Sequence, residues 1–308
     1  MRSPADCGSV MVRVPGKINL ALCSGPRRPD GYHDLVTVFQ AVSVYDDVTA
    51  EHAPPGEISI EVTGQRASAV PIGPDNLAWR AAARLAAWAG LEHRVGVRLL
   101  IEKDIPVTGG MAGGSADAAG ALLACATLWG VEIDQPALAG LGAELGADVP
   151  FCLLGGTALG VNRGDLLTPV LSRGSYHWLL ALDERGLSTP TVFAKFDQLT
   201  PPGTQLMRAE EGVCDSLAKG DAELLGKALV NDLQPAAFNL RPDLAELHRC
   251  GLELGALGAV VSGSGPTVAF LCLDESAAIE LSVKLSSEGR GGNLRRVHGP
   301  VPGARILG

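Results

Sequence analysis

The stretch from Val107 to Gly130 reads VTGGMAGGSADAAGALLACATLWG. Glycines are concentrated in its first half, and the second half is rich in alanine and leucine. Glycine adopts positive φ angles without strain and lets the backbone approach a ligand closely. Alanine and leucine favour a helix, which we expect to begin near Ser115. We interpret the stretch as a glycine-rich loop followed by a helix that ends at Gly130.

A glycine loop at the start of a helix favours anion binding, because free backbone N–H groups and the helix dipole point to the same place. The pattern is not a Walker A loop, since no Lys-Ser or Lys-Thr follows the last glycine, and it is not G-x-G-x-x-G. A packing turn of small residues explains the same letters. The stretch alone therefore leaves two interpretations open, a phosphate-binding loop and a packing turn.

The composition is that of a folded globular protein. The 308 residues are 46% apolar and 19% charged, and the length favours two domains. The net charge of −9 argues against a nucleic-acid groove, which needs clustered lysine and arginine, but it allows a small phosphorylated ligand. The seven cysteines form no C-x-x-C pair, which favours reduced thiols over a zinc site or a disulfide framework.

Two segments bear on membranes and export. The N-terminus, MRSPADCGSVMVRV, lacks the apolar run of a signal peptide. The twenty residues Leu254–Leu273 carry no charge. An uncharged segment of this length is about long enough to span a membrane. Their centre, SGSGP, would break a helix and leave backbone groups unsatisfied in lipid. We interpret this segment as two buried elements joined by a tight glycine loop, and we expect a soluble, cytoplasmic protein.

The order of predicted elements indicates an α+β fold. Strands are expected over residues 10–23, 33–50 (one strand or a pair), 56–62, 95–106, 176–182, 259–265 and 267–273. Further helices are expected over residues 76–89, 135–145, 221–229, 242–254 and 275–287. The helix at 76–89 should be capped by Asp75 and stopped by Gly90, and the helix at 135–145 should lie between Asp134 and Gly146. Thr200–Gly212 is expected to be a loop.

Three segments accompany the first glycine loop. VPGKINLAL places Lys17 after a Pro-Gly bend in an apolar strand, LGADVPF places Asp148 after a helix stop, and VSGSGPTVA is another glycine-rich loop. Each has an ordinary explanation by itself: a surface lysine, a helix cap and a hairpin turn. Their occurrence together, in this order, favours a site that handles phosphate.

These segments resemble three motifs of the GHMP kinase family, which includes galactokinase and the homoserine, mevalonate and phosphomevalonate kinases. VPGKINLAL matches the first motif, PVTGGMAGGSADAA the second and VSGSGPTVA the third, and the likeness runs nearly the full length. GKINLAL followed by RPDGYHDLVTVFQAV is similar to one member that acts on a cytidyl alcohol of isoprenoid precursor biosynthesis. The loop departs from the usual G-L-G-G-G-S at Met111 and Ala112.

The resemblance implies an ATP-dependent small-molecule kinase with two domains. Residues 1–163 would form a domain like the second domain of ribosomal protein S5, and residues 164–308 a ferredoxin-like domain. The cytidyl substrate would bind in the cleft between them. ATP and Mg²⁺ are the implied cofactors, with no metal ligand assigned. No nucleic-acid or membrane partner is implied, and we expect a monomer or a weak dimer.

The resemblance also implies roles for individual residues. Asp148 would be the catalytic aspartate and would meet the substrate, with Lys17 as its cationic partner. The nucleotide would be bound by Asn76, Lys103, Pro106, Gly109, Gly110, Gly113, Gly114 and Ser115. The substrate would be bound by Asn19, Tyr32, His33, Thr189 and Phe193, and the third glycine loop contains Gly263, Ser264 and Gly265. Without the resemblance, Tyr32 and Phe193 would be interpreted as core-packing residues and His33 as a polar side chain with satisfied hydrogen bonds.

Two other functions stay open at the level of sequence. One is a different kinase of the same family, such as a homoserine or mevalonate kinase. The other is a nucleotide-binding protein without catalysis, against which the presence of Lys17 and Asp148 argues.

Overall fold

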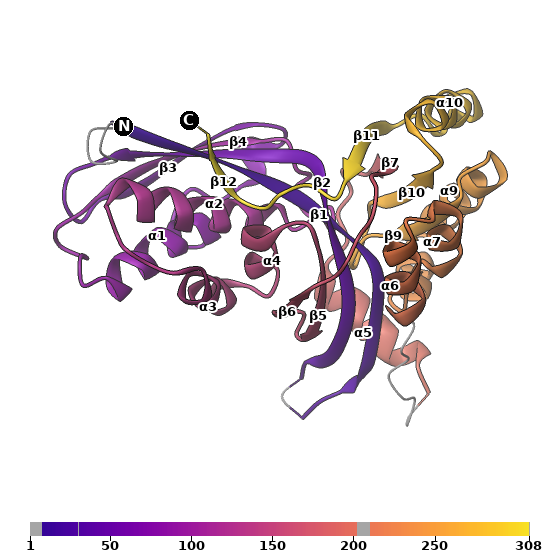
Figure 1. The fold of residues 1–308 in the computed structure, drawn as a ribbon, viewed down its shortest axis with the longest axis horizontal. Coiled ribbons are helices and arrows are strands. Elements are labelled where there is room, and N and C mark those ends of the chain that lie inside the picture. Colours follow the sequence, from indigo (N-terminus) through magenta and orange to yellow (C-terminus); the bar gives the residue numbers. More distant parts are fainter. Residues whose placement is uncertain (1–7, 30, 202–209, 308) are drawn as a thin grey trace.

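Two sheets with helices on their faces make up the computed structural model, which describes residues 8–29, 31–201 and 210–307 (Figure 1). The strands are β1 (Ser9–Arg27), β2 (His33–His52), β3 (Ile58–Gly64), β4 (Val97–Lys103), β5 (Thr157–Asn162), β6 (Leu166–Pro169), β7 (Tyr176–Leu182), β8 (Val230–Asn231), β9 (Gly258–Val261), β10 (Val268–Cys272), β11 (Asn293–Gly299) and β12 (Arg305–Leu307). The helices are α1 (Leu77–Trp88), α2 (Gly113–Leu128), α3 (Gln135–Leu145), α4 (Val149–Leu154), α5 (Thr189–Leu199), α6 (Glu210–Lys219), α7 (Ala222–Ala228), α8 (Gln234–Leu240), α9 (Pro242–Glu253) and α10 (Glu275–Leu285), with short turns η2 (Ala67–Ala69) and η3 (Ser286–Arg290). The predicted α+β class is confirmed.

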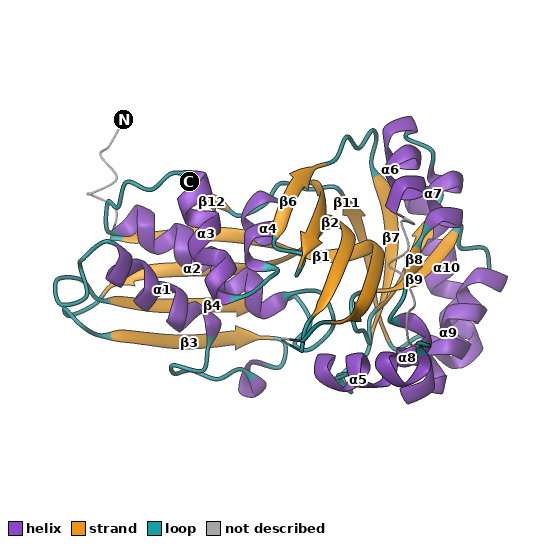
Figure 2. Ribbon diagram, turned by 90° about the horizontal axis from the view of Figure 1, so that it is seen from below, coloured by secondary structure: helices purple, strands orange, loops and turns teal. Residues whose placement is uncertain are grey.

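The first sheet is built around two long antiparallel strands, β1 and β2. Its order is β12-β1-β2-β4-β3, and β5, β6 and β8 pair with β2, β5 and β1 respectively. The register of β1 against β2 shifts between Pro15 and Gly16. The predicted Pro-Gly bend is therefore an irregularity within one continuous strand, and it sets the position of Lys17 just beyond it. Helices α1 to α4 lie over one face of this sheet (Figure 2).

The second sheet is antiparallel, with the order β11-β7-β10-β9. Numbered along the chain, its strands run 4-1-3-2, which is the ferredoxin-like arrangement that the family resemblance implies. Both faces of β7 are buried. Trp178 and Leu180 belong to one core cluster, and Leu179 and Ala181 belong to another. This double burial explains why the strand is an apolar run without alternation.

The uncharged segment at residues 254–273 contains β9 and β10, joined by a glycine-rich turn. Val261 pairs with Val268 across this turn. The prediction of two buried elements is confirmed. Among the helices of the described residues, none has both the length and the apolarity that a membrane crossing requires.

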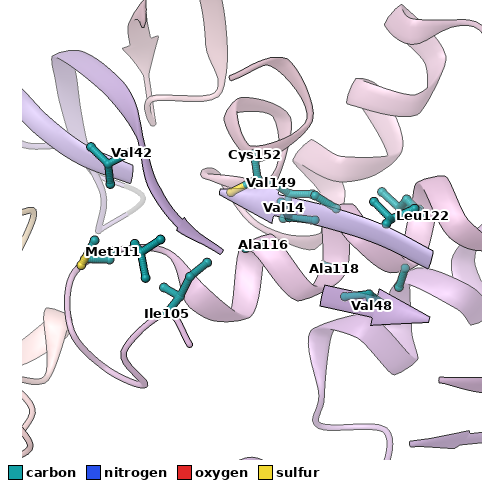
Figure 3. Close-up of a cluster of buried hydrophobic side chains, with 14 of the residues drawn as sticks. Val14, Val42, Val48, Ile105, Met111, Ala116, Ala118, Leu122, Val149 and Cys152 are labelled. Carbon is teal, nitrogen blue, oxygen red and sulfur yellow. The ribbon is translucent and has the colours of Figure 1, made fainter. Parts of the chain in front are cut away.

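The core below α2 depends on small side chains. Figure 3 shows Val14 and Val48 of the first sheet beside this helix. A Cβ at Gly120 would lie 2.7 Å from Val48 Cγ2 and 3.0 Å from Val14 Cγ2. The glycine therefore lets α2 pack directly on β1 and β2. This close packing fixes the beginning of α2 relative to Lys17 on β1.

Several local predictions can be compared with the structure. The helix α3 has the predicted ends, since the Asp134 side chain accepts a hydrogen bond from Ala137 N and Gly146 follows its last residue. Helix α2 begins at Gly113, two residues before the predicted start. The cap of α1 is Asn76, whose Oδ1 accepts from Ala78 N at 2.7 Å. The prediction of Asp75 was wrong, because two neighbouring residues with capping side chains give no sequence signal for which one adopts the extended cap conformation.

The predicted loop at residues 200–212 is partly outside the described residues, because 202–209 are not described. Glu210 begins α6, so the loop prediction was wrong for the last three residues. The acidic pair at Glu210 and Glu211 opens this helix and suits its dipole. The six described cysteines are free thiols, as predicted, and Cys7 lies outside the described residues.

The expected domain boundary at residues 163–164 lies in the turn between β5 and β6. Three strands that follow this boundary, β6, β8 and β12, pair within the first sheet. The chain thus returns twice from the second half to the first sheet. The division at this position stays a prediction.

Candidate active site

The two glycine-rich loops meet at a cleft of about 480 Å³. Most of the predicted site residues line it: Lys17, Asn19, Pro106, Gly109, Gly110, Gly113, Gly114, Ser115, Asp148, Thr189, Phe193, Gly263, Ser264 and Gly265. These residues come from β1, from the beginnings of α2, α4 and α5, and from the turn after β9. The fold therefore gathers segments that lie up to about 250 positions apart in the sequence.

Lys17 and Asp148 form an ion pair in this cleft, with 3.6 Å between Nζ and Oδ2. The Lys17 ammonium is buried and also donates to Asn19 Oδ1 at 2.8 Å. Asp148 occupies the cap position of α4, but its side chain makes no cap hydrogen bond. The ordinary explanation of Asp148 as a helix cap therefore fails. Its side chain keeps 31% of its surface exposed, so the carboxylate is accessible from the cleft.

Asn19 is held in one orientation by a chain of buried hydrogen bonds. Its Nδ2 donates to Thr37 Oγ1 at 2.8 Å, and the Thr37 hydroxyl donates to Ala21 O at 2.7 Å. The amide oxygen is thereby directed at the Lys17 ammonium. Thr37 was not predicted, because a threonine in a β-rich segment carries no signal that distinguishes it from its neighbours.

The first glycine loop follows a left-handed path. Thr108, Gly110 and Ala112 have φ angles of 58°, 75° and 62°. For Ala112 this conformation costs on the order of 1–2 kcal/mol. The neighbouring Met111 is fully buried (Figure 3), and complete burial of such a side chain contributes about 1.5–3 kcal/mol. Met111 therefore anchors the loop, and its burial is large enough to offset the strain at Ala112.

The beginning of α2 is suited to an anion. No side chain caps this helix, so the N–H groups of its first turn stay available to a ligand at the positive end of the dipole. Lys17 N donates to Met111 O at 3.2 Å, which attaches the loop to β1. The loop is consequently a structured rim of the cleft.

The third glycine loop packs against the first. Ser262 Oγ donates to Gly110 O at 3.0 Å, and a Cβ at Gly110 would lie 2.2 Å from Ser262 O. Gly263 has a φ of 56°, and a Cβ there would lie 3.4 Å from Lys17 Nζ. Glycine is required at Gly110 because the two backbones approach so closely, and it is favoured at Gly263 by the left-handed φ.

A side chamber of about 670 Å³ adjoins the cleft and contains the predicted Tyr32 and His33. The His33 ring stacks on Phe193, with 4.9 Å between ring centroids and 25° between planes. His33 Nδ1 lies 2.9 Å from Gly25 O, and Nε2 lies 3.3 Å from Asp197 Oδ1. Tyr32 is 59% exposed. One face of Phe193 is therefore taken by His33, whereas the Tyr32 side chain is open to the chamber.

Asn76 and Lys103 do not line the cleft but a third cavity of about 300 Å³, which shares Leu77, Thr108 and Gly114 with it. The buried Lys103 ammonium donates to Asp46, to Asp117 Oδ2 at 2.8 Å and to Gly113 O at 3.2 Å. Burial lowers the pKa of Lys103, but the two carboxylates outweigh it and leave the pKa raised. Lys103 thus ties the first residue of α2 to β4.

The same buried environment raises the pKa of Asp117. Burial is the largest cause, Lys103 counteracts it only in part, and the resulting pKa is about 7. Its Oδ1 is buried without a hydrogen-bond partner in the described structure.

Sequence reasoning did not single out Arg163, which lines both the cleft and the side chamber. It stands in the turn NRGD between β5 and β6. An arginine in such a turn looks like any surface arginine, and only the folded arrangement reveals where it lies.

Comparison with known proteins agrees with this geometry. The family models described as GHMP kinases N terminal domain and GHMP kinases C terminal match residues 76–156 and 215–291. A 4-diphosphocytidyl-2-C-methyl-D-erythritol kinase of Saccharopolyspora erythraea is 52% identical over 300 residues, which cover 97% of this chain and 94% of the relative.

Solved structures share the fold. The crystal structure of a 4-(cytidine 5'-diphospho)-2C-methyl-D-erythritol kinase has a TM-score of 0.73 at 33% identity. The match covers 93% of this chain and 98% of the chain in that crystal structure. A homoserine kinase from Cytophaga hutchinsonii has a TM-score of 0.77 at 19% identity, over 100% of this chain and 99% of its own, which shows likeness of fold alone. Two matched family models, a full-length relative with about half its residues identical and the three motifs around one cleft lead to one conclusion: this chain belongs to the GHMP kinase family.

Proposed function

We propose that this chain phosphorylates the 2-hydroxyl of 4-diphosphocytidyl-2-C-methyl-D-erythritol with ATP, a step of isoprenoid precursor biosynthesis by the non-mevalonate route. The observation that carries the proposal is the Lys17–Asp148 pair, which lines one cleft together with the uncapped start of α2, and this cleft adjoins the aromatic side chamber. The names of relatives with about half their residues identical support the choice of alcohol.

The phosphates of ATP would be bound by backbone N–H groups of Gly113, Gly114 and Ser115. Phosphoryl transfer depends mainly on positioning and on neutralising charge, and fixed dipoles at a helix start supply both. Lys103 would keep this helix start in place through its bond to Gly113 O. Asn76, on the same side of α2, would meet the rest of the nucleotide.

Asp148 would accept the proton of the substrate hydroxyl while the hydroxyl oxygen forms its bond to the γ-phosphorus and ADP leaves. Lys17 would hold Asp148 in place and offset negative charge as it gathers on the transferred group. Asn19 fixes the ammonium from the other side. The cytosine would bind in the side chamber at Tyr32, His33 and Phe193, where base–aromatic stacking contributes about 1–3 kcal/mol.

Magnesium would neutralise phosphate charge. In the described residues, no group of three His, Cys, Asp or Glu side chains is arranged to hold a metal ion. Magnesium keeps most of its waters and binds mainly through nucleotide phosphates. Among the oxygen groups that line the cleft, the Ser115 hydroxyl and the Asp148 carboxylate could hold it.

A coupled assay of ADP release tests the proposal, with homoserine and mevalonate as competing alcohols. We expect turnover with the cytidyl alcohol only. Asp148→Asn should bind ATP normally and lower kcat by about 10²–10⁴, the usual contribution of a positioned acid or base. No turnover of the cytidyl alcohol by the wild type, or preferred use of another alcohol, would contradict the proposed substrate. An Asp148→Asn enzyme as fast as the wild type would contradict the role of Asp148.

A further inference from the structure

The cleft and the side chamber are continuous, and five residues line both: Leu35, Arg163, Thr189, Pro190 and Phe193. Among the described residues, Arg163 is the one basic side chain that lines both spaces. Thr189 adds a hydroxyl at the same junction, where its Oγ1 lies 2.9 Å from Ser264 Oγ. The junction thus presents a cation and a hydroxyl within an otherwise apolar set.

The Arg163 guanidinium is held in place by its own turn. Nε and Nη2 donate to Asp165 Oδ2 at 3.2 and 2.7 Å, and Nη2 also approaches Ala143 O at 3.4 Å. No hydrogen bond within the described chain uses Nη1, and the side chain keeps 39% of its surface exposed. A guanidinium presents five donors, so part of its hydrogen-bonding capacity is unused.

The turn itself is held by side-chain hydrogen bonds. Asn162 has a φ of 66°, a left-handed conformation that asparagine tolerates better than most residues. Its side chain accepts from Arg28 Nη1 at 3.1 Å and donates to Asp165 Oδ1 at 3.2 Å. Asp165 is thereby fixed from two sides, and it fixes Arg163 in turn. The cation is positioned before any ligand arrives, which reduces the entropy lost on binding.

We propose that Arg163 binds the diphosphate of the substrate and so connects recognition of its two ends. The inference rests on the proposed function. A substrate with its base at Tyr32 and its hydroxyl at Asp148 has to place the intervening diphosphate at the junction. Arginine is suited to phosphate because its planar fork forms paired, charge-assisted hydrogen bonds. On a chain with a net charge of −9, a local cation offsets the repulsion that such an anion would meet.

Arg13 offers a matched control for a test of the proposed role of Arg163. Its guanidinium also donates twice to one aspartate, Asp47, at 2.9 and 2.7 Å, and its side chain is 37% exposed. It lies on β1 away from the cleft and the side chamber. Replacing either arginine by methionine therefore removes a comparable surface ion pair, while only Arg163→Met alters the junction.

The experiment compares the binding of CDP and cytidine by titration calorimetry, together with steady-state kinetics. We expect the wild type and Arg13→Met to bind CDP more tightly than cytidine. Arg163→Met should lose about ten- to a hundredfold of that preference, with cytidine affinity unchanged. It should raise KM for the cytidyl alcohol by a similar factor and leave KM for ATP unaltered, and Arg163→Lys should restore part of the loss.

Each outcome decides one claim. A CDP preference that survives in Arg163→Met overturns the inference, as does a wild type that binds neither ligand. A wild type that prefers CDP but does not turn over the cytidyl alcohol contradicts the proposed function, while the comparison of the two ligands still decides the role of Arg163. Equal weakening of CDP and cytidine in Arg163→Met shows a structural role only and likewise overturns the inference.

Discussion

At the scale of single residues, the cluster of Lys103, Asp46 and Asp117 concentrates three ionisable groups in the interior beside the start of α2. Asp46 is fully satisfied, since Asp104 N and Ile105 N donate to its Oδ1 and Lys103 to its other oxygen. Asp117 is not, because its Oδ1 has no partner in the described structure. The groups that face Asp117 are Lys103 from β4 and Asp46 from β2. Stability should therefore depend on the protonation of Asp117.

We predict that stability falls as the pH rises from about 4 to about 7. The pKa of Asp117 is near 7 in the folded chain and near 3.8 without the fold, so the folded state binds this proton more tightly over that range. Deprotonation then costs folding free energy. Thermal unfolding at several pH values should show a steeper decline for the wild type than for Asp117→Asn. The control Asp215→Asn, at an exposed position of α6, should keep the wild-type slope, and equal slopes in all three proteins would contradict the prediction.

At the scale of secondary-structure elements, α1 combines a structural and a proposed binding role in one residue. Asn76 accepts from Ala78 N through Oδ1 and donates to Pro71 O through Nδ2 at 2.7 Å. It also lines the cavity beside Gly114 and Lys103. The two roles can be tested separately, because capping α1 uses only the amide oxygen of Asn76 as a hydrogen-bond acceptor.

Asn76→Ala should lower the free energy of unfolding by about 1 kcal/mol, the usual cost of losing a helix cap. Asn76→Asp keeps the capping oxygen, but it puts a second carboxylate oxygen where Nδ2 donates to Pro71 O and places a negative charge at the proposed nucleotide cavity. We therefore expect Asn76→Asp to keep only part of the capping contribution and to raise KM for ATP more than Asn76→Ala does. Urea unfolding and ATP kinetics measure the two effects. An unchanged KM for ATP in Asn76→Asp would show that Asn76 is a cap alone.

Elements with local signals could be predicted from the sequence, and elements created by distant pairing could not. Asp134 and Gly146 mark both ends of α3 within a few residues. By contrast, β12 has three residues and exists because it pairs with β1, as Val12 with Ile306. The site divides in the same way. Motif residues such as Lys17 and Asp148 could be predicted, whereas Arg163 and Thr37 acquire their positions only through tertiary contacts.

At the scale of the whole molecule, the first sheet needs the end of the chain. β1 pairs with β2 on one side and with β12 and β8 on the other, and both of the latter come from beyond residue 229. Arg295 of β11 also forms a paired bond to Asp104, with distances of 2.6 and 2.7 Å. The two halves are consequently joined by strands as well as by side chains.

A fragment of residues 1–163 should therefore not unfold cooperatively, because it leaves one edge of β1 unpaired and removes β6. Circular dichroism during heating would show a broad transition or aggregation. Co-expression with residues 164–308 should restore the sharp transition of the full chain. A sharp, reversible transition of the fragment alone would contradict this prediction.

The hydrogen bond from Ser262 to Gly110 has a consequence for biosynthesis. A ribosome releases Gly110 long before Ser262, so the nascent chain carries an unfinished first glycine loop for about half of its synthesis. The loop acquires its partner only when 46 of the 308 residues remain to be made. Nascent chains that end before Ser262 should therefore be unable to consume ATP.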